Sequence, residues 1–163
     1  MVIDLDRTDR HLLDLLQQDA RQSLENLAAQ VNLSTAAVQR RIKRLRDSKV
    51  ITGEVVRVDE AAVGMAMTFI VSVELDRERA SEIDAFRRKA SKEPQVQQAY
   101  YTTGEADFVL IVLAHDMDDY ELLTQRLFFD DPNIRRFRTS VVMGKSYRSL
   151  TVPTTHSAAN LAD

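Results

Sequence analysis

The chain has 163 residues, an apolar fraction of 44% and no cysteine. It is long enough for one average folded domain or two small ones, and it offers no disulfide, thiolate metal site or cysteine nucleophile. No apolar run approaches the ~18 residues that span a membrane, and acids occupy the N-terminus where a signal peptide is basic, so the cytoplasm is the expected compartment.

The net charge of −3 argues against a nucleic-acid partner only if the charge is evenly spread. Residues 34–49 hold six basic residues and one acid, Asp47, so this segment carries +5 and the remainder carries −8. A basic helical face is most often simply solvated. The pattern therefore indicates DNA binding only if its surroundings support it.

Two helices are predicted before the basic segment. Asp6 and Asp9 place acceptors at the start of a helix over about residues 7–18, in which leucines form a buried stripe. Ser23 is suited to cap a second, short helix that ends near Val31.

A third helix follows after a tight turn. Asn32 suits the left-handed position after a helix, and Ser34 or Thr35 can cap the next one. At 100° per residue, one side of this helix is apolar, with Val38, Ile42 and Leu45. The other side begins with small residues and continues with basic ones: Ala36, Ala37, Arg40, Lys43 and Arg44.

This third helix suits a reader of the DNA major groove. Small residues at its start allow the backbone to approach base edges, Arg and Lys bind guanine or phosphate, and Gln39 can pair with adenine. Three short helices with a basic third one form a helix-turn-helix pattern, which favours DNA over a merely solvated face. We expect Arg41 and Arg46, at the flanks, to hold phosphates. The predicted DNA contacts are Ser34, Thr35, Ala36, Ala37, Gln39, Arg40, Arg41, Lys43, Arg44 and Arg46.

The remaining elements predict an α+β domain. Residues 50–58 suggest a strand or small wing with its turn at Gly53, and residues 67–75 alternate as a strand with one buried face. The elements that follow are a helix capped by Ser81 and closed by Pro94, strands over 96–103 and 107–114, a helix opened by Asp116 or Asp118, and a strand over 134–143.

The order βαββαβ is that of the ferredoxin-like fold, a sheet with two helices on one face. The other face of the sheet needs cover, and dimerisation through it is the simplest solution. A two-fold partner also places two reading helices on a pseudo-palindromic DNA site.

Four motifs, in this order and spacing, resemble the Lrp/AsnC family of feast/famine regulators. They are LDRTDR at residues 5–10, the helix-turn-helix after it, TGEADF at 103–108 and TSVVM at 139–143. The resemblance spans about residues 3–153. It implies a winged helix-turn-helix joined to a ferredoxin-like regulatory (RAM) domain, which dimerises, often assembles further to a tetramer of dimers, and binds an amino acid between dimers.

The resemblance also implies an effector pocket. A zwitterion needs donors for its carboxylate, which backbone N–H groups around Gly104 can supply, and an acceptor for its ammonium, which Asp107 or Glu105 can supply. Without the resemblance, residues 104–107 are typical of an ordinary hairpin turn. The positions carried over are Tyr101, Thr103, Gly104, Glu105, Ala106, Asp107, Met117, Ser140, Val141 and Val142.

The sequence thus predicts a helix-turn-helix DNA-binding domain over 1–50, a wing or linker strand over 51–64, a ligand-binding and oligomerisation domain over 65–149, and a flexible C-terminal tail over 150–163. The expected function is sequence-specific transcriptional regulation modulated by a small effector, an amino acid by resemblance. The expected partners are double-stranded DNA, this effector and further copies of the chain, as a dimer or up to an octamer. No cofactor, metal or membrane is expected.

Two other functions are weighed against this one. An architectural protein would wrap DNA through phosphate contacts with little sequence choice. An enzyme is the third reading, because some tetrapyrrole-processing decarboxylases resemble the same two-domain family and use histidine and arginine. Of the three histidines, His11 and His115 fit surface or boundary positions better than catalytic ones, and His156 falls in the expected tail. The basic third helix favours DNA.

Overall fold

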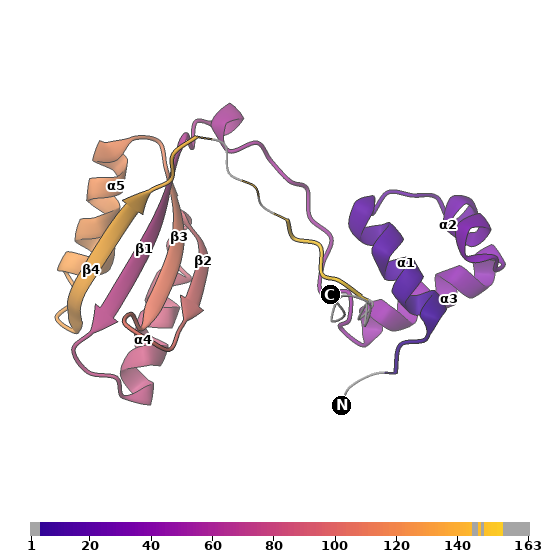
Figure 1. Ribbon diagram of the computed structural model, residues 1–163, viewed down its shortest axis with the longest axis horizontal. Helices are drawn as coiled ribbons and strands as arrows, with labels where there is room; N and C mark the ends of the chain where they lie inside the picture. Colours follow the sequence, from indigo (N-terminus) through magenta and orange to yellow (C-terminus); the bar gives the residue numbers. More distant parts are fainter. Residues whose placement is uncertain (1–3, 145–146, 148, 155–163) are drawn as a thin grey trace, which may run out of the picture. The chain divides into compact units, whose positions relative to one another are not determined.

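The computed structural model describes residues 4–144, 147 and 149–154. The chain divides into two compact units (Figure 1), which we call the helical unit, residues 1–56 with 148–163, and the sheet unit, residues 57–147. The sheet unit therefore begins inside the segment predicted as a wing or linker. Within the described residues, no helix is long and apolar enough to cross a membrane.

The described residues of the helical unit form three helices, which the sequence pattern predicted. They are α1 (Arg7–Gln18), α2 (Leu24–Val31) and α3 (Thr35–Asp47). Each begins at a polar N-cap whose side chain accepts a backbone N–H of the first turn: Asp6, Ser23 and Ser34. Asn32 closes α2 in the left-handed conformation, at φ 55° and ψ 48°.

Each of these helices contributes an apolar stripe to one small core. The stripe of α3 is the predicted one, so its basic residues lie on the remaining surface. Burial of these side chains fixes how α3 is turned relative to α1 and α2. The buried members of the core are Leu12, Leu15, Leu27, Ala28, Val38 and Ile42.

The predicted wing strand is wrong: residues 52–59 form neither strand nor helix. The side chains of Val55 and Val56 remain exposed. A strand needs a neighbour for its backbone N–H and C=O groups, and within the described residues this segment has none. The segment therefore connects the two units without forming a strand, although its sequence favours extended backbone. It leads to the short 3-10 helix η1 (Ala61–Val63).

The sheet unit has the predicted βαββαβ order. Its elements are β1 (Met67–Leu75), α4 (Ala80–Ala90), β2 (Val96–Tyr101), β3 (Phe108–Ala114), α5 (Met117–Thr124) and β4 (Ile134–Val141). The strands are antiparallel in the order β2-β3-β1-β4, and α4 and α5 lie on one face of the sheet (Figure 1). A π-helical turn, η2 (Gln125–Phe129), extends α5.

The core of the sheet unit lies between this face and the two helices. Alternate residues of β1 are buried there, and Phe69 stacks on Tyr120 of α5 with ring centroids 3.9 Å apart. Phe86 of α4 packs against Phe108 of β3. The opposite surface, which we call the open face, carries the other half of each strand.

Some predicted boundaries shift. The helix α4 begins at Ala80 without a side-chain cap, so Ser81 lies inside its first turn rather than at its N-cap. The strand β2 ends at Tyr101 because Thr102 begins a turn, in which its backbone N–H donates to the carbonyl of Asp107 at 2.8 Å. The strand β4 ends at Val141, two residues earlier than predicted.

Part of the predicted flexible tail contacts α1. The backbone N–H of Val152 donates to Gln17 Oε1 at 2.7 Å, and Gln17 Nε2 donates to the carbonyl of Val152 at 3.0 Å. The hydroxyl of Thr154 donates to Asp14 Oδ1 at 2.7 Å, and Arg10 Nη1 donates to the carbonyl of Thr154 at 2.6 Å. Val152 and Thr154 thus have defined partners, whereas residues 155–163 lie outside the described residues.

Candidate DNA interface and effector site

The N-terminal end of α3 is accessible, as a groove-reading helix requires. Ser34, Thr35 and Ala36 are exposed, and Ala37 is half-buried. The Ser34 hydroxyl accepts the backbone N–H of Ala37 at 3.3 Å, so this predicted contact residue also caps the helix.

The residues of α3 outside its apolar stripe fall into three rows along the helix. Arg40 lies in the middle row, and its side chain has no hydrogen bond or ion pair within the described part of the chain. Advancing 100° per residue places Gln39, Lys43 and Arg46 on one side of Arg40 and Ala37, Arg41 and Arg44 on the other. The ten predicted contacts are therefore brought together on one helix but do not share one face.

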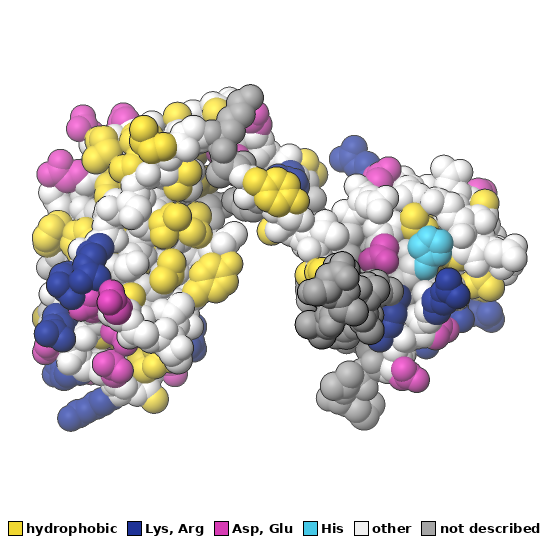
Figure 2. All heavy atoms as spheres, viewed as in Figure 1, with side chains coloured by type: hydrophobic (Ala, Val, Ile, Leu, Met, Phe, Trp, Pro, Cys, Tyr) yellow, Lys and Arg dark blue, Asp and Glu magenta, His cyan; other side chains and the backbone are white. Residues whose placement is uncertain are grey.

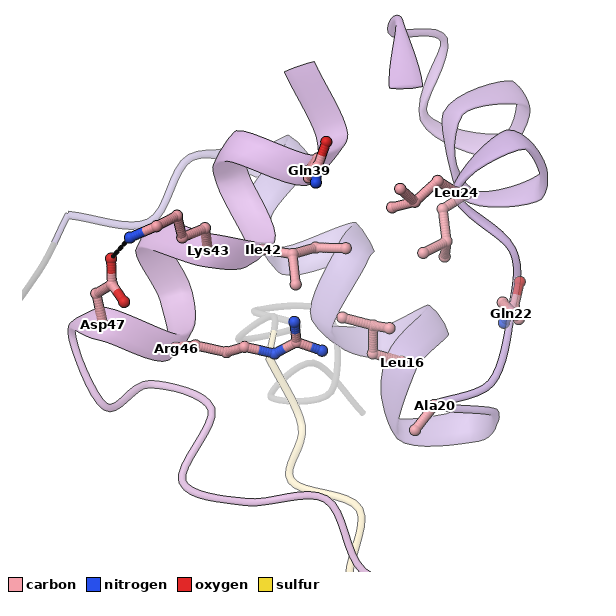
Figure 3. Close-up of a pocket in the computed structure, with 10 residues that line it drawn as sticks. Leu16, Ala20, Gln22, Leu24, Gln39, Ile42, Lys43, Arg46 and Asp47 are labelled. Carbon is pink, nitrogen blue, oxygen red and sulfur yellow. Dashed lines mark hydrogen bonds and ion pairs between the residues drawn. The ribbon is translucent and has the colours of Figure 1, made fainter. Parts of the chain in front are cut away.

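The Gln39 side of α3 borders a cleft of about 450 Å³ between the helices (Figure 3). Lys43 pairs with Asp47 at 2.6 Å, and Arg46 pairs with Glu54 at 2.5 Å. Both pairs are exposed, so they stabilise little and leave the two cations available to a phosphate. The apolar residues that line the cleft are Leu16, Ala20, Leu24, Leu27 and Ile42.

The Arg44 side of α3 faces the start of α1. Arg41 Nη1 lies 2.8 Å from Asp9 Oδ1 and 2.6 Å from Asp6 Oδ2. Arg44 Nη2 pairs with the other oxygen of Asp9, Oδ2. The side chain of Asp9 is only 1% exposed, so both arginines meet a carboxylate that is removed from water.

The N-cap of α1 takes part in the same cluster. Asp6 and Asp9 form a capping box in which each side chain accepts the backbone N–H of the other residue. The backbone N–H of Asp9, followed by the Arg41 guanidinium, lowers the pKa of Asp6 from its ordinary 3.8. Hydrogen bonds to Asp6 and then Asp9 raise the pKa of Arg41. Sequence reasoning treated both acids only as helix acceptors, and their partners are more than 30 positions away.

The predicted effector loop follows β2 at one end of the sheet. Gly104 has φ +124°, a conformation in which other residues are strained. The carboxylate of Asp107 accepts the backbone N–H of Leu75 at 2.7 Å, so one of its oxygens already has a partner. Glu105 is 92% exposed, with Arg138 at 3.7 Å as its ion-pair partner.

The other predicted effector residues lie at the opposite end of the sheet. Ser140 is paired with Ile70, and the backbone N–H of Val142 donates to Thr68, near the start of β1. Met117 begins α5 after β3, which ends at that same side. The loop, in contrast, contacts Val73 and Leu75 at the end of β1.

The two groups of effector residues are therefore separated by most of the length of β1. About six residues of extended strand correspond to roughly 20 Å. A single amino acid is too short to contact both groups in one copy. The sequence placed these residues in one pocket but could not give their register. Within one copy, the fold brings Tyr101 and residues 103–107 together and keeps them apart from Met117 and residues 140–142.

The surface of the sheet unit carries many hydrophobic side chains (Figure 2). On the open face, Ile70 of β1 is 40% exposed and pairs with Ile111 of β3, while Tyr100 of β2 is 51% exposed and pairs with Val109. A contiguous apolar strip of this kind on a sheet face is typical of an interaction surface.

The histidines considered for an enzyme are dispersed. His11 is exposed on α1, and His115 Nδ1 lies 2.9 Å from the carbonyl of Gly64. His156 lies outside the described residues.

A helix-turn-helix unit with a cationic third helix, joined to an antiparallel βαββαβ unit, defines a class: DNA-binding transcriptional regulators with a second, regulatory domain. Comparison with known families agrees. Residues 5–46 match the AsnC-type helix-turn-helix domain, and residues 68–152 match the Lrp/AsnC ligand binding domain. The chain belongs to the Lrp/AsnC family of transcriptional regulators, which confirms the resemblance seen in the sequence. Its members are regulators, not enzymes.

Similar proteins match over nearly their whole length. The HTH-type transcriptional regulator y4tD of Sinorhizobium fredii is 44% identical over 93% of this chain and 89% of its own. The transcriptional regulator AzlB of Bacillus subtilis is 34% identical over 94% and 98%. Among solved structures, the feast or famine regulatory protein of M. tuberculosis, complexed with L-methionine, has 29% identity and a TM-score of 0.82 over 91% and 99%.

Proposed function

We propose that this regulator binds specific DNA sequences through α3 and that a small effector, an amino acid, modulates it from a site between regulatory domains of different copies. The observation that carries the effector part is the split of the predicted pocket. One copy presents Tyr101 and residues 103–107 at one end of the sheet and Met117 with residues 140–142 at the other. A second copy, turned end for end, brings the two groups together.

The chemistry of the two groups suits a zwitterion. The loop around Gly104 supplies backbone N–H donors for a carboxylate, and the exposed Glu105 supplies an acceptor for an ammonium. The similar M. tuberculosis protein is described in complex with L-methionine, which supports an amino acid as the effector class. The apolar strip of the open face supports self-association, as a dimer or a higher oligomer.

The effector is tested by thermal unfolding against a panel of the common amino acids, each with and without target DNA. A true effector at about 100 times its dissociation constant adds about 2.7 kcal/mol to the free energy of unfolding. Glu105→Gln should weaken that binding by tenfold or more, because a charge-assisted hydrogen bond is lost. The control is Glu78→Gln, at an exposed acid that has no partner among the described residues, and it should leave binding unchanged. If no amino acid shifts the transition, the effector class is wrong.

The DNA part is tested by the ratio of affinities for a selected promoter site and a random duplex at physiological salt. Sequence readers exceed a ratio of about 10³. A ratio below about ten would replace this proposal with the architectural alternative, in which phosphate contacts alone hold the DNA.

A further inference from the structure

We infer that Asp9 is a positioning residue of the DNA interface: its buried carboxylate binds Arg41 and Arg44, which withdraws both from DNA and leaves Arg40 as the principal cation that reads it. The inference rests on the proposed DNA binding by α3. It divides the basic residues of α3, which the sequence treats as one group, into cations that hold the helix and cations that contact the ligand.

The first support is the completeness of the contacts at Asp9. Oδ1 receives Arg41, and Oδ2 receives Arg44 together with the backbone N–H of Asp6 at 3.2 Å. The carboxylate is only 1% exposed. Such a group has lost its water and depends on these partners, so removal of either guanidinium leaves a buried charge poorly compensated.

The second support is the direction in which the two arginines extend. Positions 41 and 44 are three residues apart and so share one row of α3, the row that faces the N-terminus of α1. Arg41 is further held by Asp6 at 2.6 Å. To bind a DNA phosphate, these arginines would have to leave a carboxylate that is removed from water. The phosphate lies at the hydrated surface of DNA, where salt screens its attraction.

The third support is the contrast with the other cations of α3. Arg40 is exposed without a partner in the described part of the chain, and Lys43 has only the exposed Asp47, an ion pair that contributes little. Arg40 and Lys43 can therefore reach DNA without breaking a buried interaction. In α3, Arg40 lies on the row most distant from the core, and Lys43 lies on the row beside it.

The experiment compares Arg40→Gln with Arg44→Gln, which remove the same charge from neighbouring turns of the same helix. Binding of full-length protein to a promoter site and to random duplex is measured by fluorescence anisotropy over a range of salt. Arg40→Gln should leave the melting temperature unchanged and lower the salt slope by about 0.9 per lost phosphate contact, or change base preference. Arg44→Gln should lower the melting temperature and change the slope by less than half as much.

Asp9→Asn tests a change in DNA binding that a purely structural role of Asp9 would not predict. It frees Arg44 and leaves Arg41 held only by Asp6, so the affinity for random duplex and the salt slope should both rise, by about one phosphate contact per reading helix and by at most two, while the specificity ratio falls. A folded Asp9→Asn protein with an unchanged or smaller slope overturns the inference. If this variant does not fold, the salt slopes of Arg40→Gln and Arg44→Gln test the inference instead. Equal losses of slope in these two variants would overturn the inference. Absence of DNA binding by the unmodified protein would instead contradict the proposed function.

Discussion

At the scale of single residues, the acids at the start of α1 have two roles, of which the sequence motif indicates only the first, helix capping. Asp6 and Asp9 close the capping box of α1, and they also receive arginines from α3. Asp6 uses Oδ1 for the cap and Oδ2 for Arg41, whereas Oδ2 of Asp9 accepts both the backbone N–H of Asp6 and the guanidinium of Arg44. The reading helix is therefore tied to α1 through the first turn of that helix.

The lowered pKa of Asp6 makes the helical unit sensitive to acid. A depressed pKa means that folding favours the carboxylate, so its stabilisation is complete above the ordinary value of 3.8 and is lost as pH falls through the lower, folded value. Asp6→Asn should make the free energy of unfolding fall less steeply between about pH 5 and pH 2. Denaturant titrations followed by circular dichroism measure this.

At the scale of elements, helix caps show which sequence signals were sufficient. Ser34 caps α3, with its hydroxyl 3.3 Å from the backbone N of Ala37, whereas Ser81 lies inside α4 without a capping hydrogen bond. Both serines precede an amphipathic pattern, so the sequence alone does not separate them. The start of α4 depends on how the chain leaves β1 and packs Phe86 against the sheet.

These two serines allow a matched test of capping. Ser34→Ala should cost about 1 kcal/mol of stability because an orphan N–H of α3 loses its acceptor. Ser81→Ala should change stability by less than about 0.5 kcal/mol, since alanine suits a helix interior. Urea unfolding of both variants measures the difference, and equal losses would show that Ser34 does not act as a cap.

The contact between α1 and residues 152–154 makes a second prediction at this scale. Gln17→Ala removes both hydrogen bonds to the backbone of Val152 and should cost about 1 kcal/mol, the usual net value for such partly exposed bonds. Deletion of residues 150–163 should cause a larger loss, because it also removes the hydrogen bonds of Thr154 with Asp14 and Arg10, and it should make Gln17→Ala neutral. Gln18→Ala, at an exposed position of the same helix, is the control and should have no effect.

At the scale of the whole molecule, antiparallel register decides where the effector residues lie. The strand β4 pairs with β1 so that Ser140 lies opposite Ile70, far from the loop that contacts Leu75. The loop and the end of β4 are 34 or more residues apart in sequence, and only strand pairing sets their separation in space. The proposed pocket therefore requires two copies.

This requirement can be tested by mixing two variants that each lack half of the pocket. Gly104→Val strains the loop, because φ is +124°, and Ser140→Lys introduces a charge at the other end of the sheet. Each variant alone should lose effector binding. After random reassociation, about half of the pairs are mixed and each of these has one intact site, so about a quarter of the binding should return. No recovery would mean that each pocket is built from one copy.

The sequence by itself determined the helices, the strands of the sheet unit and their βαββαβ order. Helical and alternating patterns are local, and each buried stripe identifies its own element: the leucines of α1 and the alternation in β1 required no knowledge of the rest of the fold. The candidate DNA residues followed from the same local pattern, and the effector residues followed from resemblance to a family.

Only the tertiary structure decided what these residues contact. The partners of Asp9 are 32 and 35 positions away, the two effector groups are separated by the register of β1, and residues 52–59 form no strand because no neighbouring strand pairs with them. Such facts depend on long-range packing and hydrogen bonding, which a periodic pattern does not encode. For this reason the basic face of α3, one group in the sequence, is divided in the structure between Arg41 and Arg44, which pair with the buried Asp9, and Arg40, Lys43 and Arg46, which are exposed.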